Sequence, residues 1–255
     1  MDIDLNRISE GLRLAGDILR KYATEGFTTE RKAERGDPVT EADIECDRVL
    51  REFLPQKGDG WLSEETADDA QRLTCSRVWV VDPLDGTREF VEGIPEWCVS
   101  IGLVENGQPV AGGIYNPLSD QMIVGSVDRG VTLNGAPARA VARAELDGAV
   151  VLASRSEVKR GEWDRFERDP FTVRPTGSVA FKLGLVAVGE VDATWTLVPK
   201  SEWDVAAGVA LIRSAGGEAF TLDWGSPVFN QPVPKLTGLI ACGPNLVTPI
   251  RKLLG

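Results

Sequence analysis

Three strand-like runs joined by short turns restrict the fold of this chain more than any other feature. The runs are Cys98–Glu105, Val110–Tyr115 and Gln121–Val127, and the turn-forming pairs Asn106-Gly107 and Asn116-Pro117 separate them. Strands that follow one another through such tight connections pair antiparallel, because a parallel pair needs a crossover of about a dozen residues. The middle of the chain therefore predicts an antiparallel sheet built as a meander.

The segments on either side of the meander carry helical patterns. Apolar residues recur at three- and four-residue spacing from Leu5 to Leu19, which predicts an amphipathic first helix. Pro38-Val39-Thr40 opens a second helix, with Thr40 as the N-cap and Asp43 at the N3 position of a capping box.

From about Leu146 the pattern changes to alternating strands and helices. Strands are predicted at Ala149–Ala153, Val191–Thr196 and Leu239–Ala241, and helices at Ser178–Val188 and Val205–Ser214. We expect an N-terminal α+β half over residues 1–145 and a C-terminal α/β half over residues 146–255. The halves are predicted to share one body, because no Pro- or Ser-rich linker separates them.

Composition excludes several kinds of chemistry. The 255 residues include no histidine, so Ser-His-Asp hydrolases and H-E-x-x-H zinc enzymes are ruled out. The net charge of −11 argues against binding of long nucleic acids, which need a basic face. No apolar run approaches the roughly 20 residues that span a membrane, and we expect no signal peptide because the start MDIDLNRISE has no basic segment before an apolar stretch. A cytoplasmic protein is the expectation, and the charge still allows a small anionic substrate where local cations or metal ions invert the potential at the site.

The segment Asp82-Pro83-Leu84-Asp85-Gly86-Thr87 is the strongest candidate site. It follows the apolar run Val78–Val81, which is predicted to be a buried strand that stops at Asp82. A type I turn explains the same residues, because Asp, Pro and Gly are typical of one. Two carboxylates held this close are costly unless a cation lies between them, and Mg²⁺ prefers such oxygen ligands. Backbone N–H groups of Gly86 and Thr87 would then favour a phosphate.

Two further acidic positions have ordinary explanations when they are taken alone. Glu64 and Glu65 fit a solvated acidic loop, and Asp204 fits a helix N-cap in front of the apolar run that starts at Val205. Either position could instead complete a metal site.

Taken together, four blocks in this order resemble the inositol monophosphatase superfamily. They are Pro38-Val39-Thr40 with Asp43, Ser63-Glu64-Glu65, Trp79 to Thr87, and Trp203-Asp204-Val205-Ala206-Ala207-Gly208. The resemblance implies a layered αβαβα sandwich with an antiparallel N-terminal sheet and a mixed C-terminal sheet. It also implies a cluster of two or three Mg²⁺ ions and a possible homodimer.

The resemblance also implies a role for each matched residue. The metal ligands would be Glu64, Asp82, the Leu84 carbonyl, Asp85 and Asp204. Thr87, hydrogen-bonded to Asp43, would orient and deprotonate the attacking water, and Lys32 stands where the family often has a lysine near the outermost metal. A water activated by metal needs no histidine.

Within the superfamily, Asp82 to Phe90 looks most like bacterial 3′-phosphoadenosine-5′-phosphate phosphatases. Ser154-Arg155-Ser156 and Gly177-Ser178 with Lys182 fit the same branch, which implies phosphate or substrate binding by Arg155, Ser178 and Lys182. Glu157 replaces a histidine that is frequent in this branch.

The expected reaction is removal of the 3′-phosphate of adenosine 3′,5′-bisphosphate. The alternative is an inositol-1-phosphatase or broad sugar-phosphate phosphatase, although Leu197 stands where inositol phosphatases place a substrate-binding glutamate. A non-catalytic binding protein, the third class, would have lost a site residue, and none is lost.

Overall fold

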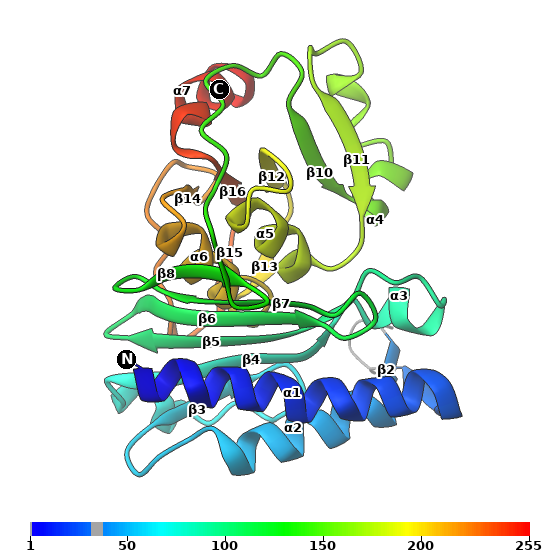
Figure 1. Cartoon of the computed structure of the whole chain (residues 1–255), viewed down its shortest axis with the longest axis vertical. Coiled ribbons are helices and arrows are strands. Elements are labelled where there is room, and N and C mark those ends of the chain that lie inside the picture. The colour runs from blue at the N-terminus through cyan, green and yellow to red at the C-terminus, as the bar shows by residue number, and fades with distance from the viewer. Residues whose placement is uncertain (1, 32–37) are drawn as a thin grey trace.

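The computed structural model describes residues 2–31 and 38–255, which form five stacked layers of helices and sheets (Figure 1). The helical layers contain α1 (Asp2–Glu25) with α2 (Glu41–Phe53), then α5 (Val179–Ala187) with α6 (Glu202–Ser214), then α4 (Arg155–Lys159) with α7 (Val247–Leu254). The short helix α3 (Thr87–Val91) follows the end of β4. A seven-stranded and a five-stranded sheet lie between the helical layers, so the predicted αβαβα sandwich is confirmed.

The larger sheet contains the predicted meander. Its strands lie in chain order: β3 (Gly60–Ser63), β4 (Arg77–Asp85), β5 (Cys98–Glu105), β6 (Gln108–Asn116), β7 (Gln121–Ser126), β8 (Gly130–Leu133) and β9 (Ala136–Ala138). Neighbours pair antiparallel except β3 and β4, which are parallel. Asn106 and Gly107 both have positive φ angles, of 49° and 77°, as a two-residue hairpin turn requires.

Strand β4 is longer than the sequence predicts. It continues through Asp82 to Asp85, and Asp82 pairs with Ser100 while Asp85 pairs with Cys98. The register shifts between these two pairs, so the acidic motif is the bulged end of a strand and not a free turn. A bulge is one of the few places where a sheet accepts a proline, and Pro83 occupies it.

Both faces of this sheet are buried. Trp79 and Val81 point into the core shared with α1 and α2, whereas Val78 and Val80 point into the core shared with α5 and α6. Helix α6 approaches the sheet closely at Gly112, where an added Cβ atom would come within 2.7 Å of the Ala207 carbonyl oxygen. This close contact brings the beginning of α6 to the same edge of the sheet as Asp82.

The second sheet is mixed, as predicted. Its order is β11 (Thr172–Thr176), β10 (Val150–Ser154), β12 (Ala193–Thr196), β16 (Leu239–Cys242) and β14 (Glu218–Phe220). The first three strands are parallel, and the last two pair antiparallel. Two small antiparallel pairs complete the structure: β1 (Thr29–Arg31) with β2 (Pro38–Thr40), and β13 (Lys200–Ser201) with β15 (Lys235–Leu236).

The start of α2 and the division of the chain into halves are both predicted from the sequence. Pro38–Thr40 forms the short strand β2, and α2 begins at Glu41, directly after the predicted N-cap Thr40. The division into halves at residues 145 and 146 stays a prediction. Within the part of the chain that is described, no helix has the length and apolar character needed to cross a membrane.

Candidate functional site

Three carboxylates from distant parts of the chain meet at the end of β4. One oxygen from each of Glu64, Asp82 and Asp204 lies within 4.8 Å of the others. The parallel pairing of β3 with β4 continues into the contact of the Glu64 N–H with the Val81 carbonyl, at 3.3 Å, so Glu64 lies beside Asp82. Asp204 arrives from the first turn of α6.

Asp204 does not have the local position that the sequence suggested. Ser201 is the N-cap of α6, and Asp204 is the N3 residue of a capping box whose Oδ2 accepts from the Ser201 N–H at 2.9 Å. The pattern Ser-x-x-Asp from Ser201 to Asp204 is the signal that identifies this cap. Asp43 has the same position in α2, where the predicted capping box is confirmed.

Burial and mutual repulsion act on these acids. The pKa of Asp82, which is 2% exposed, is raised well above its usual value by burial and then by the charges of Glu64, Asp85 and Asp204. The pKa of Asp204 is raised to about 8, again mainly by burial. Burying these acids together lowers the stability of the folded protein when no cation is bound, and a bound cation offsets their repulsion.

Asp85 is held by the turn in front of α5. Its Oδ2 accepts hydrogen bonds from Ser178 Oγ, at 2.7 Å, and from the Ala180 N–H. Lys182 braces the same turn, because its Nζ donates to the carbonyls of Ser178 (2.8 Å) and Thr176 (3.3 Å). Burial lowers the pKa of Lys182 to about 8.

Thr87, the first residue of α3, forms a hydrogen bond with Asp43 of α2. Thr87 Oγ1 lies 3.1 Å from Asp43 Oδ1 and 3.0 Å from the Leu84 carbonyl oxygen. The other oxygen of Asp43, Oδ2, accepts from the N–H and the hydroxyl of Thr40, at 2.7 and 2.6 Å. Asp43 therefore caps its helix with one oxygen and reaches Thr87 with the other.

A cavity of about 250 Å³ opens over these groups. The predicted site residues that line it are Glu64, Leu84, Asp85, Gly86, Thr87, Ser178, Lys182 and Asp204. Lys200, which the sequence did not single out, also lines it, and so do Ser154 and Ser156.

Two predicted cations lie elsewhere or outside the described residues. Arg155 is not among the lining residues, because both of its contacts, at 2.6 Å, go to the carboxylate of Glu96. Glu96 also accepts from the Gly177 N–H, so this ion pair fixes the turn that carries Ser178. Lys32 lies outside the described residues.

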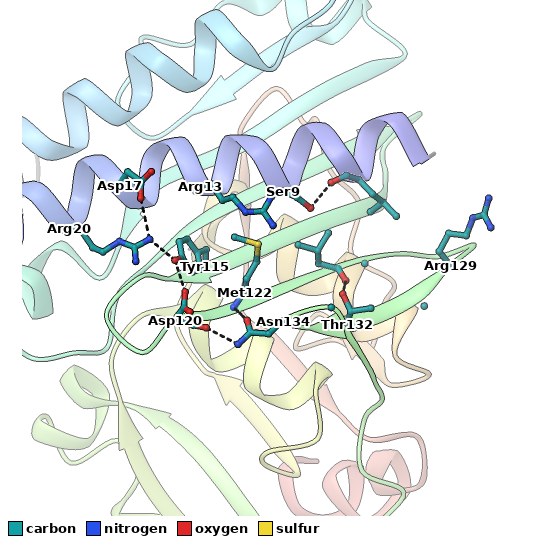
Figure 2. Close-up of a pocket in the computed structure, with 15 residues that line it drawn as sticks. Ser9, Arg13, Asp17, Arg20, Tyr115, Asp120, Met122, Arg129, Thr132 and Asn134 are labelled. Atoms are coloured by element: carbon teal, nitrogen blue, oxygen red, sulfur yellow. Dashed lines mark hydrogen bonds and ion pairs between the residues drawn. The ribbon is translucent and has the colours of Figure 1, made fainter.

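A larger groove, of about 640 Å³, lies between α1 and strands β6 to β8. Several of its polar groups are joined by hydrogen bonds: Arg20 donates to Asp17 and to the Tyr115 hydroxyl, which donates to Asp120 (Figure 2). The groove contains none of the carboxylates described above. Chemistry therefore favours the smaller cavity as the functional site.

Gly86, at the turn from β4 into α3, is expected to tolerate no side chain. Its φ angle is +98°, and an added Cβ would lie 3.0 Å from the Glu96 carbonyl oxygen and 3.1 Å from Trp97 Cβ. Gly86→Ala should cost about 1–3 kcal/mol of stability and reduce activity, measured by thermal unfolding and an activity assay. Gly93→Ala is the matched control, since Gly93 has φ +69° and open space around its Cβ. Equal effects of the two substitutions would contradict the role of the close contact.

Comparison with known proteins identifies the family of this chain. The model of the inositol monophosphatase family matches residues 6–248. Inositol monophosphatase 3 of Solanum lycopersicum is 35% identical over 230 residues, covering 83% of this chain and 83% of the relative.

Solved structures show the same fold. The IMPase of Thermotoga maritima has a TM-score of 0.83 at 26% identity, covering 100% of this chain and 97% of the other. CysQ of Bacteroides thetaiotaomicron, described as a bacterial member of the inositol monophosphatase family, has a TM-score of 0.79 at 25% identity, covering 94% and 96%. The chain therefore belongs to the inositol monophosphatase family, whose members are metal-dependent phosphatases.

Proposed function

We propose that this chain is a Mg²⁺-dependent phosphomonoesterase that holds two or three Mg²⁺ ions in the cavity at the end of β4. The observation that carries the proposal is the convergence of Glu64, Asp82 and Asp204 within 4.8 Å. Asp85 and the Leu84 carbonyl, at the bulged end of the same strand, would complete the set of oxygen ligands.

The donor set fits magnesium. All the proposed ligands are hard oxygen atoms, which Mg²⁺ prefers. The charges that act most strongly on the pKa of Asp82 are those of the carboxylates Glu64, Asp85, Asp204 and Glu65, and a bound cation would offset their repulsion. When bound, Mg²⁺ supplies positive charge that makes a water more acidic and neutralises charge on the phosphate.

The chain's own groups would position the reactants. The Thr87 hydroxyl has one proton, which it can donate to Asp43 Oδ1, and lone pairs that can accept a hydrogen bond from the attacking water. We assign phosphate binding to the N–H groups of Gly86 and Thr87, because N–H groups at the start of a helix have no partner within it. Ser178 and Lys182 hold Asp85 and the turn beside it.

For the substrate, we propose adenosine 3′,5′-bisphosphate, which loses its 3′-phosphate. Support comes from Lys200, Arg88 and the buried Lys182, three basic residues among those that line the cavity of a protein with a net charge of −11. The second candidate is inositol-1-phosphate or another sugar phosphate. The name of the Solanum lycopersicum relative, an inositol monophosphatase, favours it.

The test is release of inorganic phosphate by the purified protein with Mg²⁺ and with EDTA. We expect release from a panel of adenosine 3′,5′-bisphosphate, inositol-1-phosphate and sugar phosphates only when Mg²⁺ is present, and highest kcat/KM on the bisphosphate. A higher kcat/KM on inositol-1-phosphate would decide for the second candidate. Metal-independent release, or none from any substrate, would contradict the phosphatase itself.

The remaining expectations concern partners and location. The predicted homodimer is supported only by family membership and is tested by light scattering during gel filtration. Cytoplasmic location, and the predicted lack of binding to nucleic acid polymers and membranes, stay predictions.

A further inference from the structure

Lys200 presents a charged group to the cavity without using its hydrogen-bond donors inside the protein. It lies in β13, four residues before Asp204, and its side chain is 15% exposed. Its Nζ makes one ion pair, 3.8 Å from Glu157 Oε1, and no hydrogen bond within the part of the chain that the structure describes. An ammonium group has three donors, so all three remain for a ligand.

The partner of Lys200 is held rigidly. Glu157, in α4, is fully buried, and its carboxylate accepts from Trp163 Nε1 at 3.1 Å and from the Thr196 hydroxyl. Trp163 in turn stacks on Trp195, with ring centroids 5.1 Å apart and an interplanar angle of 17°. The carboxylate therefore has two fixed donors in addition to the ion pair, and it anchors Lys200.

Lys200 also lies within electrostatic reach of the metal-site side of the cavity. Its positive charge acts on Asp204 and on Lys182, which is a second ammonium group lining the same space. Lys182 and Lys200 repel each other, although Asp85, Glu89 and Glu157 also act on Lys182, and an anion bound in the cavity would offset that repulsion. The cavity thus has an anionic face for metal and a cationic face beside it.

We infer that Lys200, positioned by Glu157, binds a second anionic group of the substrate, one that is not the phosphate being cleaved. This inference rests on the proposed phosphatase function and narrows its substrate to phosphomonoesters that carry a further phosphate or similar anion. Lys200 is then a specificity residue, and Glu157 is a positioning residue that sets the direction of its side chain.

The test compares substrates that differ by that one group. Adenosine 3′,5′-bisphosphate and adenosine 3′-monophosphate form one pair, and fructose 1,6-bisphosphate and fructose 1-phosphate form another. Wild-type protein should have a higher kcat/KM on the bisphosphate of at least one pair. Lys200→Ala should lower kcat/KM on that bisphosphate by about 10- to 100-fold, mostly through KM, and by at least tenfold more than on its monophosphate.

Two further variants separate binding from stability. Lys200→Ala leaves Glu157 buried without its charged partner, which destabilises a protein. The double variant Lys200→Met with Glu157→Gln removes both charges, and the Gln amide can accept from Trp163 and donate to Thr196; it should fold and show the same selective loss. Lys235→Ala removes an exposed lysine from the neighbouring strand β15 and should leave the preference between the paired substrates unchanged.

Each contrary outcome has a distinct meaning. Equal losses on both members of a pair, in both Lys200 variants, would make Lys200 a structural residue and overturn the inference. Mg²⁺-dependent release from substrates with one phosphate only, such as inositol-1-phosphate, would overturn it while the phosphatase function stands. Absence of Mg²⁺-dependent release from every substrate would remove the proposed function and the inference with it.

Discussion

Asp82→Asn is expected to lower phosphate release more than a hundredfold while making the metal-free protein more stable. The loss of activity should exceed the 10- to 100-fold cost that is typical of residues that only orient a metal ligand, because Asp82 is proposed to be a ligand itself. The fold should persist, since the Asn side-chain oxygen can still accept from the Leu84 N–H, which lies 3.1 Å from Asp82 Oδ1.

The gain in stability follows from repulsion among the carboxylates. Asp82 is buried beside Glu64, Asp85 and Asp204, and removing its charge relieves that repulsion by about 0.5–2 kcal/mol. In wild-type protein, Mg²⁺ at about 100 times its Kd should add roughly 2.7 kcal/mol to the stability of the folded state. The variant should lose most of this effect, so the order of the two melting temperatures should reverse when Mg²⁺ is added.

Thermal unfolding with Mg²⁺ and with EDTA measures both effects without an activity assay. Asp128→Asn removes an exposed carboxylate outside the cavity and serves as the control for net charge. A variant that keeps activity within a few-fold of wild type, or that keeps the full Mg²⁺ shift, would remove Asp82 from the metal site.

Local features of the fold were predictable from the sequence. The meander follows from turn residues that lie between the strands, and the capping box of Thr40 and Asp43 spans only four residues. The end of β4 was not predictable in this way. Whether Asp82 to Asp85 forms a turn or a bulged strand depends on pairing with Ser100 and Cys98, which are distant in sequence.

In the candidate site too, the contacts between residues distant in sequence were not predictable from local patterns. Each acidic residue alone has an ordinary explanation, and only the order of four blocks, recognised as a resemblance, placed Glu64, Asp82 and Asp204 together. The ion pairs Arg155–Glu96 and Lys200–Glu157 join residues 59 and 43 positions apart (155 − 96 and 200 − 157), and nothing in the spacing reveals them. The resemblance of Ser154-Arg155-Ser156 therefore predicts Arg155 as a substrate residue, whereas the structure pairs it with Glu96, and no sequence pattern singles out Lys200.

Thr87→Val and Asp43→Asn are each expected to lower kcat by about 10²–10⁴-fold with little change in KM, because both remove the path for a proton from the attacking water. Valine has the shape of threonine without its hydroxyl. In wild-type protein the Thr40 N–H donates to Asp43 Oδ2 at 2.7 Å. Because this N–H can only donate, the side-chain oxygen of the introduced asparagine should take the place of Oδ2 in Asp43→Asn. The NH₂ group then faces Thr87 and cannot accept its proton. The helix cap survives in this variant while the contact with Thr87 is inverted.

The double variant distinguishes a working pair from two separate contributions. If Thr87 and Asp43 act together on one water, removing the second partner costs little more, and the double variant should resemble the worse single variant. Thr87→Ser should restore most of kcat, because it returns the hydroxyl. Thr40→Ala tests the possibility that Asp43 matters only as a cap. It removes the hydroxyl that donates to Asp43 Oδ2 and accepts from the Asp43 backbone N–H, at a cost of about 1 kcal/mol in stability, and should leave kcat within a few-fold of wild type. Losses that multiply in the double variant, or a loss of kcat in Thr40→Ala as large as in Asp43→Asn, would show that the two residues do not act as a pair on the reaction.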